Sequence, residues 1–298
     1  MMATAFVYSG QGAQYFGMGQ ELYNEYAVVR AVFEEASATL GYDVAELCFQ
    51  ENDKLHLTEY TQPAILTVSY ALDQLLAEKG IQPDFVAGLS LGEYTALVKA
   101  NAFSFNEAIS LVPAGRGKMA AVMNAERSVI EESCREASET AYVAPANYNM
   151  PTQIVIGGEI EGVDKAIEIL ESKGVKRIIP LKVSGPFHTA LLHPAAEKLE
   201  VALSEVAVDE PKIPVVGNTE ATIVARDAIK GLLVRQIESP VLWEDSVRKL
   251  VELGVDTFVE IGPGTTLSKF IKKINKEVAV YNVEDLKSLN KTLEALQK

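Results

Sequence analysis

The sequence is poor in cysteine and has no long apolar run. Its two cysteines, Cys48 and Cys134, lie far apart and lack the spacing of a zinc site, so we expect neither a disulfide framework nor a structural metal. No stretch is apolar for long enough to span a bilayer. The segment Met1–Tyr8 is too short, and too soon followed by Gly and Gln, for a secretory signal. These absences together predict a protein of the reducing cytoplasm.

Basic residues are also in the minority. The chain has 27 Lys and Arg against 41 Asp and Glu, which gives a formal net charge of -14. A field of that sign opposes binding to nucleic acid or to an anionic membrane, so we predict neither partner. An acidic protein partner would need a local basic patch. The plainest interpretation of the charge itself is solubility.

Short apolar runs alternate with longer segments of helical periodicity. The 298 residues, 48% of them hydrophobic, suffice for one large core or for a large core and a smaller module. The predicted buried strands are Thr4–Tyr8, Phe85–Gly88, Ile213–Val216, Thr257–Ile261 and Val278–Asn282. The predicted helices are Gln62–Lys79, Leu91–Val98, Asp245–Glu252, Thr266–Lys276 and Glu284–Gln297. This alternation predicts an α/β protein with a parallel sheet covered by helices.

A second pattern interrupts the first. It consists of a strand, a helix, two strands, a helix and a strand, at Met119–Met123, Arg127–Glu139, Tyr142–Asn147, Gln153–Gly157, Val163–Lys173 and Arg177–Val183. The order β-α-β-β-α-β is ferredoxin-like. We therefore predict a small ferredoxin-like domain at residues 119–184, inserted into a large domain made of residues 1–118 and 185–298.

The sharpest local motif is Gly-x-Ser-x-Gly at residues 88–92, between a predicted strand and a helical segment. This is the arrangement of a nucleophile elbow. The two glycines leave room for a sharp turn that presents the Ser90 hydroxyl at the end of the sheet. The amide of Leu91, at the start of the helix, can then face a developing oxyanion. The motif also fits a serine that only caps a helix, so it does not decide the function alone.

Three histidines are available as a base for Ser90. His188 follows a predicted strand and a rigid Gly185-Pro186 turn, which is where a catalytic loop belongs. His56 lies in a charged, polar stretch, and His193 precedes a proline at a predicted helix start. We therefore predict His188 as the general base and a structural or surface role for the other two.

The loop Ser9–Gln14 follows the first predicted strand and reads Ser-Gly-Gln-Gly-Ala-Gln. A dinucleotide fingerprint would need glycine at position 15, where the chain has Tyr15, so nucleotide binding is not predicted. Backbone amides at the carboxyl end of a strand can supply a second oxyanion donor. We assign this role to the amide of Gln11, although Gly10 and Gly12 would also suit a plain turn.

Eight segments in order carry a family resemblance that covers nearly the whole chain. They are Gly10-Gln11-Gly12-Ala13-Gln14, Thr61-Gln62-Pro63-Ala64, Gly88-Leu89-Ser90-Leu91-Gly92-Glu93-Tyr94, Asn147-Tyr148-Asn149-Met150-Pro151, Gly185-Pro186-Phe187-His188, Gly217-Asn218-Thr219, Leu233-Val234-Arg235-Gln236 and Glu260-Ile261-Gly262-Pro263-Gly264. With these segments the chain resembles the malonyl-CoA:acyl carrier protein transacylases of bacterial fatty acid synthesis and the acyltransferase domains of polyketide synthases.

The resemblance implies a hydrolase-like large domain and a ferredoxin-like small domain, with the site between them. It implies Ser90 as nucleophile, His188 as general base and a backbone carbonyl near Gln236 that orients the imidazole. Further residues near the substrate are Gln62, Asn147 and Phe187. The bulky ring of Phe187 implies malonyl selectivity, because it would crowd a branched acyl chain.

The implied activity is malonyl transfer from malonyl-CoA to the phosphopantetheine thiol of acyl carrier protein, through a malonyl ester on Ser90. The reaction would need no metal or redox cofactor, with the coenzyme A thioester as substrate. A serine hydrolase or thioesterase shares the elbow, but usually places an acidic residue between the serine and a late histidine. A catalytically impaired acyl-binding homologue is the other alternative.

The chain departs from the family pattern in two places. The family usually has histidine before the nucleophile, where this chain has Leu89, and we expect little effect. The family also binds the malonyl carboxylate with an arginine in a Leu-Val-x-x-Arg-Gly context, on a helix after the nucleophile helix. Here Arg116 comes one position late, and Pro113 and Gly115 would end such a helix first. Either Arg116 fills the role, or a segment of roughly ten residues is absent together with the true clamp.

Two groups of basic residues could dock an acidic carrier protein. One is on the predicted helix Thr266–Lys276 and consists of Lys269, Lys272, Lys273 and Lys276. The other is in the predicted small domain and consists of Lys173, Lys176, Arg177 and Lys182. A solvated helix face is the commoner explanation of such spacing.

Overall fold

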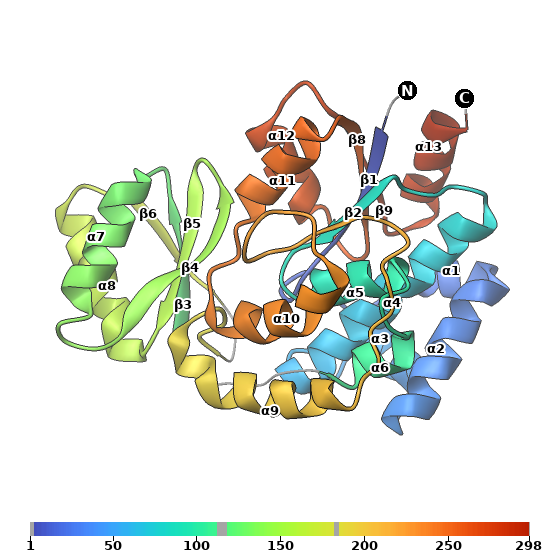
Figure 1. The fold of residues 1–298 in the computed structure, drawn as a ribbon, viewed down its shortest axis with the longest axis horizontal. Coiled ribbons are helices and arrows are strands. Elements are labelled where there is room, and N and C mark those ends of the chain that lie inside the picture. Colours follow the sequence, from blue (N-terminus) through green and yellow to red (C-terminus); the bar gives the residue numbers. More distant parts are fainter. Residues whose placement is uncertain (1–2, 112–117, 182–184, 298) are drawn as a thin grey trace.

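The chain forms a large and a small domain side by side (Figure 1). The computed structural model describes residues 3–111, 118–181 and 185–297. The small domain consists of elements from the middle of the chain, between residues 118 and 180, and the first and last described segments lie on the large domain. The small domain is therefore inserted into the large one. The exact domain boundaries, at residues 118 and 184, stay a prediction.

The large domain is built on five parallel strands in the order β7-β2-β1-β8-β9. The strands are β1 (Ala3–Tyr8), β2 (Phe85–Gly88), β7 (Val215–Val216), β8 (Val255–Ile261) and β9 (Ala279–Val283). The central strand β1 is covered on both faces. Phe6 and Tyr8 pack in one apolar cluster, and Ala5 and Val7 pack in a second cluster on the opposite face. Burial on both faces explains why the strands read as continuous apolar runs.

The helices of the large domain divide between these two faces. The larger cluster receives residues from α1 (Gln20–Glu25), α2 (Ala27–Leu40), α3 (Val44–Phe49), α4 (Thr58–Glu78), α5 (Gly92–Lys99), α6 (Phe105–Ile109), α9 (His193–Ser204), α10 (Ile229–Glu238) and α13 (Leu286–Leu296). The smaller cluster receives residues from α11 (Trp243–Glu252) and α12 (Thr266–Ile274). Two short 3-10 turns lie at Ala190–Leu192 and Arg226–Ala228. None of the helices in the described ranges combines the length and the apolar character that a bilayer crossing requires.

The small domain is an antiparallel sheet in the order β4-β5-β3-β6, with two helices. Its elements are β3 (Lys118–Met123), α7 (Arg127–Ala137), β4 (Val143–Met150), β5 (Gln153–Gly158), α8 (Ile160–Ser172) and β6 (Arg177–Pro180). Ala120 and Val122 of β3 face the helices. Met119 and Ala121, on the other face, belong to a cluster that also contacts Phe187 of the large domain.

A short pairing of backbone groups joins the two domains. The amide of Tyr148 on β4 donates to the carbonyl of Val241 at 2.8 Å, and the amide of Val241 donates to Ala146 at 2.9 Å. Helix α12 contacts β8 and β9 of the large sheet and also β4 of the small one. The edge of β4 therefore lies against the large domain, where the two sheets approach each other.

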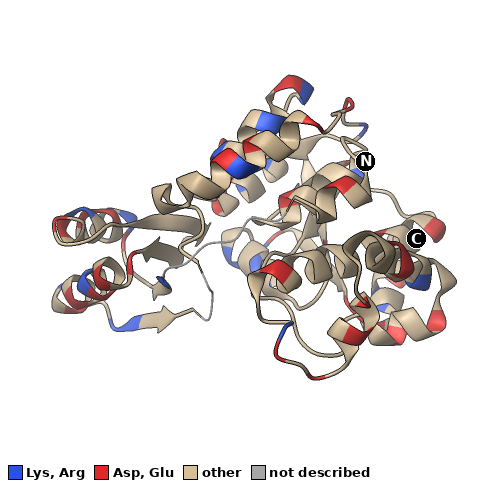
Figure 2. Ribbon diagram, turned by 90° about the horizontal axis from the view of Figure 1, so that it is seen from below, with Lys and Arg blue, Asp and Glu red and all other residues tan. Residues whose placement is uncertain are grey.

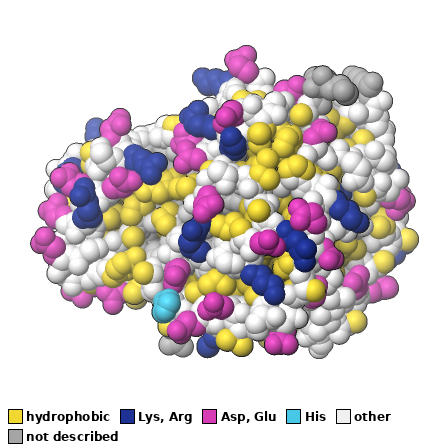
Figure 3. Space-filling view, viewed as in Figure 1, with side chains coloured by type: hydrophobic (Ala, Val, Ile, Leu, Met, Phe, Trp, Pro, Cys, Tyr) yellow, Lys and Arg dark blue, Asp and Glu magenta, His cyan; other side chains and the backbone are white. Residues whose placement is uncertain are grey.

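Charged residues lie mainly on the outer helices and loops, with both signs mixed (Figure 2). On the face shown in Figure 3, acidic and basic side chains alternate, with apolar side chains between them. Several predicted helix boundaries differ from the structure by two residues or more, and two of them concern residues that were singled out in the sequence. Helix α4 begins at Thr58 rather than Gln62, so that Pro63 lies inside it. Helix α12 ends at Ile274, so that Lys276 lies beyond the helix.

Candidate active site

Three polar residues follow neighbouring strands at the same edge of the large sheet. Gln11 comes after β1, Ser90 after β2 and Asn218 after β7, and these strands are adjacent and parallel. The carboxyl ends of parallel strands share one edge, which is the usual place for a ligand site in such sheets. The topology therefore brings together residues that are 79 to 207 positions apart in the sequence.

The Ser90 turn depends on close backbone contacts. A Cβ at Gly88 would lie 1.9 Å from the carbonyl carbon of Gly92, and one at Gly92 would lie 2.1 Å from the carbonyl oxygen of Tyr8. Ser90 itself has φ 57°, a left-handed conformation that non-glycine residues adopt rarely. Asn218 stabilises this turn from the neighbouring strand: its Oδ1 accepts from the Ser90 amide at 2.7 Å, and its Nδ2 donates to the Gly88 carbonyl at 2.6 Å.

The turn places Ser90 against His188. Ser90 Oγ lies 2.7 Å from His188 Nε2, and His188 Nδ1 lies 2.7 Å from the backbone carbonyl oxygen of Gln236. His188 is buried, and burial lowers its pKa from 6.5 to about 4, while the Gln236 carbonyl opposes the shift. The imidazole is therefore neutral near pH 7. With Nδ1–H donating to Gln236, Nε2 is free to accept the Ser90 proton.

The end of α10 explains why the Gln236 carbonyl is available. The last four carbonyls of a helix have no partner within it, and Gln236 lies in the last turn of α10. The residue four positions on is Pro240, which has no N–H to donate. The same carbonyl lies at the negative end of the helix dipole, which favours a positive imidazole during proton transfer.

Comparison with known proteins shows the family of the chain. The family model described as "Acyl transferase domain" matches residues 5–293. The chain belongs to the acyl transferase family. A malonyl CoA-acyl carrier protein transacylase of Bacillus subtilis is 41% identical over 312 aligned positions, which cover all of this chain and 98% of the relative. Among solved structures, MCAT from Streptococcus pneumoniae is 51% identical with a TM-score of 0.94, covering 98% of this chain and all of the other. A malonyl-transacylase solved with its type II PKS acyl-carrier protein is 39% identical with a TM-score of 0.95, covering 98% and 99%.

The first loop of this acyl transferase lies against the nucleophile turn. A Cβ at Gly10 would lie 2.5 Å from the carbonyl oxygen of Leu89, directly before Ser90. The neighbouring Gln11 is held by its side chain, which donates to Thr58 Oγ1 at 3.0 Å and accepts from Gln62 Nε2 at 3.0 Å. Gln62 therefore fixes the loop that carries the Gln11 amide. The contact of Gln62 with substrate and the role of the Gln11 amide as an oxyanion donor stay predictions.

The remaining predicted residues lie around the junction of the two domains. Asn147 is buried on β4, where this strand meets Val241. The ring of Phe187 lies beside the imidazole of His188, with 6.5 Å between the ring centroids, and packs on the small sheet. Arg116 lies outside the described residues. The 312 aligned positions exceed the 298 residues of the chain by 14, so the alignment contains at least 14 positions without a counterpart here.

Two residues of this network received no role from the sequence. Asn218 spans the Ser90 turn, and Glu93 accepts hydrogen bonds from the Asn218 amide at 3.3 Å and from Gln236 Nε2. The sequence did contain a signal for each. Glu93 is a carboxyl in an otherwise apolar helical segment, and Asn218 is a polar residue just beyond a buried strand.

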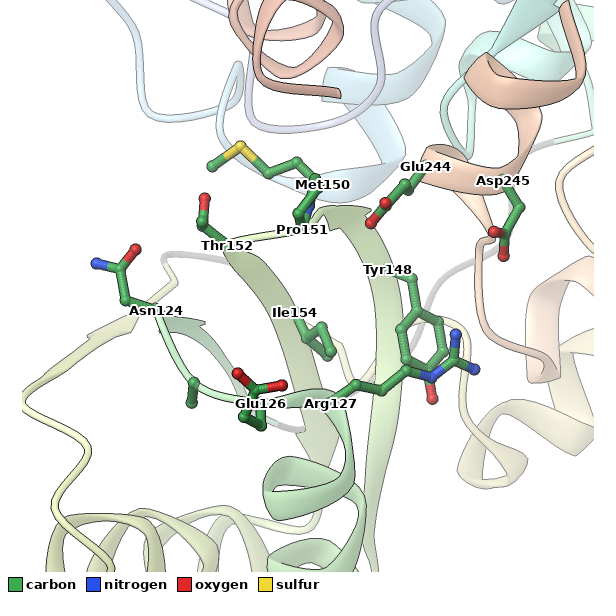
Figure 4. A pocket seen from close by; sticks show the side chains of 11 residues that line it. Asn124, Glu126, Arg127, Tyr148, Met150, Pro151, Thr152, Ile154, Glu244 and Asp245 are labelled. Atoms are coloured by element: carbon green, nitrogen blue, oxygen red, sulfur yellow. The ribbon is translucent and has the colours of Figure 1, made fainter. Parts of the chain in front are cut away.

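A pocket of about 480 Å³ lies away from these residues, between the β4–β5 turn and the first turns of α7 and α11 (Figure 4). The guanidinium of Arg127 lies 4.0 Å from the centre of the Tyr148 ring and pairs with Glu131 at 2.8 Å. Glu244 and Asp245 line the opposite side. Since Arg127 is already paired, this pocket offers no free cation to an acyl carboxylate.

Proposed function

We propose that this acyl transferase moves a malonyl group from malonyl-CoA to the phosphopantetheine thiol of an acyl carrier protein. The observation that carries the proposal is the 2.7 Å contact between Ser90 Oγ and His188 Nε2. It occurs in a chain whose relatives are named malonyl CoA-acyl carrier protein transacylase. A similar structure solved with an acyl-carrier protein supports such a partner here.

The first half-reaction forms an ester on Ser90. His188 Nε2 accepts the hydroxyl proton as Oγ attacks the thioester carbonyl carbon. Negative charge develops on the carbonyl oxygen, where the amides of Gln11 and Leu91 donate hydrogen bonds; each such donor lowers the barrier by about 3 kcal/mol. The carbon–sulfur bond then breaks, coenzyme A leaves with the proton from His188, and the malonyl ester remains.

The second half-reaction reverses these steps with a new thiol. The carrier thiol gives its proton to His188 and attacks the ester carbonyl, and His188 returns a proton to Ser90 Oγ as that bond breaks. These steps use side chains and amides of the chain itself, so the proposal invokes no metal or redox cofactor. Coenzyme A enters only as the substrate thioester. Kinetics should be ping-pong.

The covalent step can be tested without the carrier protein. Incubation with malonyl-CoA should leave a malonyl group on the peptide that contains Ser90, detected by mass spectrometry, and Ser90→Ala should abolish it. Sequential kinetics without a trapped acyl-enzyme would refute the proposal. Release of free malonate at the turnover rate, with no thiol acceptor present, would instead support a hydrolase.

The binding of the malonyl carboxylate is the part that depends on Arg116. An arginine can bind a carboxylate through two parallel hydrogen bonds, which also selects against uncharged acyl groups. Arg116→Ala should therefore raise KM for malonyl-CoA at least tenfold while leaving KM for acetyl-CoA unchanged, an effect of about 1.4 kcal/mol. Equal effects on the two thioesters would exclude Arg116 as the clamp.

We also place the protein in the cytoplasm. Cys48 and Cys134 are both buried and free, and burial raises the pKa of each thiol to about 12. Two unpaired thiols suit a reducing compartment. Fractionation of cells that express the chain should recover it with the cytoplasmic fraction, and recovery with the membrane or secreted fraction would contradict this.

A further inference from the structure

Glu93 is a buried carboxyl close to the candidate active site that the mechanism does not use. It lies on α5, three residues after Ser90, and is 2% exposed. Among the described residues, Glu93 forms no ion pair and its hydrogen-bond donors are neutral: the backbone amide of Asn218 and Nε2 of Gln236 both donate to the same carboxyl oxygen. A buried carboxyl without a cation is costly to keep, so its presence beside a reactive serine needs a reason.

Both partners of Glu93 contact the reacting groups through other atoms. The side chain of Asn218 bonds to the backbone on either side of the Ser90 turn, at Ser90 N and Gly88 O. Gln236 accepts from His188 through its backbone carbonyl, and its Nε2 also approaches the Ser90 carbonyl at 3.3 Å. Glu93 therefore contacts both Asn218, which holds the Ser90 turn, and Gln236, which orients His188.

We propose that Glu93 is a positioning residue. By accepting hydrogen bonds from Asn218 and Gln236 it fixes their positions relative to each other, so that Ser90 and His188 keep their productive geometry. The three elements involved, α5, the segment after β7 and the end of α10, come from separate parts of the chain. A displacement of about 1 Å at a reacting pair can cost 10²-fold in rate. This inference rests on the proposed acyl transfer through Ser90.

The test compares an apolar and an amide replacement of Glu93. Glu93→Leu removes the acceptor, so the rate constant for malonyl-Ser90 formation should fall by about ten- to a hundred-fold while KM for malonyl-CoA stays within about twofold. Glu93→Gln keeps an oxygen that can accept both hydrogen bonds and should restore the rate constant to within about threefold of the wild-type value. An unchanged rate constant in Glu93→Leu, or no rescue in Glu93→Gln, would overturn the proposal.

Glu260→Leu is a matched control, because Glu260 is also buried and accepts two backbone hydrogen bonds, from Leu267 and Ser268 at the start of α12. It should lower Tm without changing the acylation rate constant of the folded protein. If Glu93→Leu does not fold, Gln236→Leu removes the contact with Glu93, together with the 3.3 Å approach of Nε2 to the Ser90 carbonyl, and keeps the backbone carbonyl that His188 uses. It should show the same loss of rate constant, and an unchanged value would overturn the proposal.

A wild-type protein that forms no malonyl-Ser90 would refute the proposed function and not this inference. Labelling of Ser90 by an organophosphonate then provides the rate to compare between the variants. It should show the same order: wild type and Glu93→Gln fast, Glu93→Leu slow. Equal labelling rates would overturn the positioning role of Glu93.

Discussion

At the scale of single residues, burial sets the pH range in which His188 can act. Its pKa of about 4, against an ordinary value of 6.5, means that the proton-accepting neutral form persists well below neutrality. We expect the rate constant for Ser90 acylation to stay level from pH 8 to about pH 5 and to fall around pH 4. Single-turnover measurements after short pH jumps check this. A fall centred at the ordinary value would contradict it, and His193→Gln, which changes an exposed histidine, should leave the profile unchanged.

The pKa of Glu93 shifts in the opposite direction to that of His188. Burial raises its pKa from 4.5 to about 7, although hydrogen bonds from Gln236 and Asn218 oppose the change. The folded protein therefore keeps a proton that the unfolded chain loses, and stability is lost as the pH rises from 4.5 through 7. Glu93→Gln, which cannot ionise, should gain on the order of 3 kcal/mol relative to wild type between pH 5 and pH 8. Urea unfolding of both proteins at the two pH values measures this gain, and a constant difference would contradict it.

The sequence predicted the residues that lie in a short recognisable motif or directly after a predicted strand and turn. Ser90 lies in a recognisable motif, and the scarcity of histidine left His188 as the candidate that follows a strand and a rigid turn. Glu93 and Asn218 received no role, because their contacts form only when α5, the end of β7 and α10 pack together. A carboxyl in an apolar helix is ambiguous until its partners are known.

At the scale of elements, two glycine substitutions should have opposite effects. A Cβ at Gly88 would lie 1.9 Å from backbone of the Ser90 turn, which cannot move without displacing α5. Gly88→Ala should therefore cost about 3 kcal/mol or more of folding stability. At Gly231, inside α10, a Cβ would have no atom within 4 Å apart from its chain neighbours and the backbone of its own helix. Gly231→Ala should raise stability by about 0.5–1 kcal/mol, since alanine is the better helix former. Thermal unfolding checks both, and a neutral Gly88→Ala would contradict the close packing.

Periodicity predicted the buried strands well, because burial on both faces of the parallel sheet leaves continuous apolar runs. Boundaries were less accurate. Helix α4 begins before Pro63, since the chain accepts the loss of one backbone hydrogen bond where the flanking residues are buried. Helix α2 was not predicted, although buried positions such as Val29, Val32 and Phe33 follow a helical spacing. Strand β7 was predicted at Ile213–Val216, but only Val215 and Val216 pair with the neighbouring strand.

At the scale of the whole molecule, the two basic groups that were considered for carrier docking differ in where they lie, although Lys176 and Arg177 of the small domain are exposed as well. In the small domain, Lys173 pairs with Glu132 and Glu136 at 3.5 and 3.2 Å. Helix α12 instead lies where the two domains meet, in contact with β4 and with β8 and β9. Its Lys272 donates to backbone carbonyls beyond the helix end, whereas Lys269 and Lys273 are exposed on the same helix. These two side chains are better placed to meet an acidic partner near the junction.

The double variant Lys269→Glu/Lys273→Glu should therefore weaken docking and leave the chemistry intact. In a molecule of net charge -14, local reversal adds repulsion against an acidic carrier, so KM for the carrier protein should rise by about tenfold, and the effect should shrink at high salt. KM for malonyl-CoA and the Ser90 acylation rate should not change. Lys291→Glu, on α13, reverses an exposed charge elsewhere and serves as the control. Equal effects on the KM values for both substrates would exclude α12 as the docking helix. So would a rise in KM for the carrier protein that is as large in Lys291→Glu as in the double variant, because docking depends on where the charges lie and not on the net charge alone.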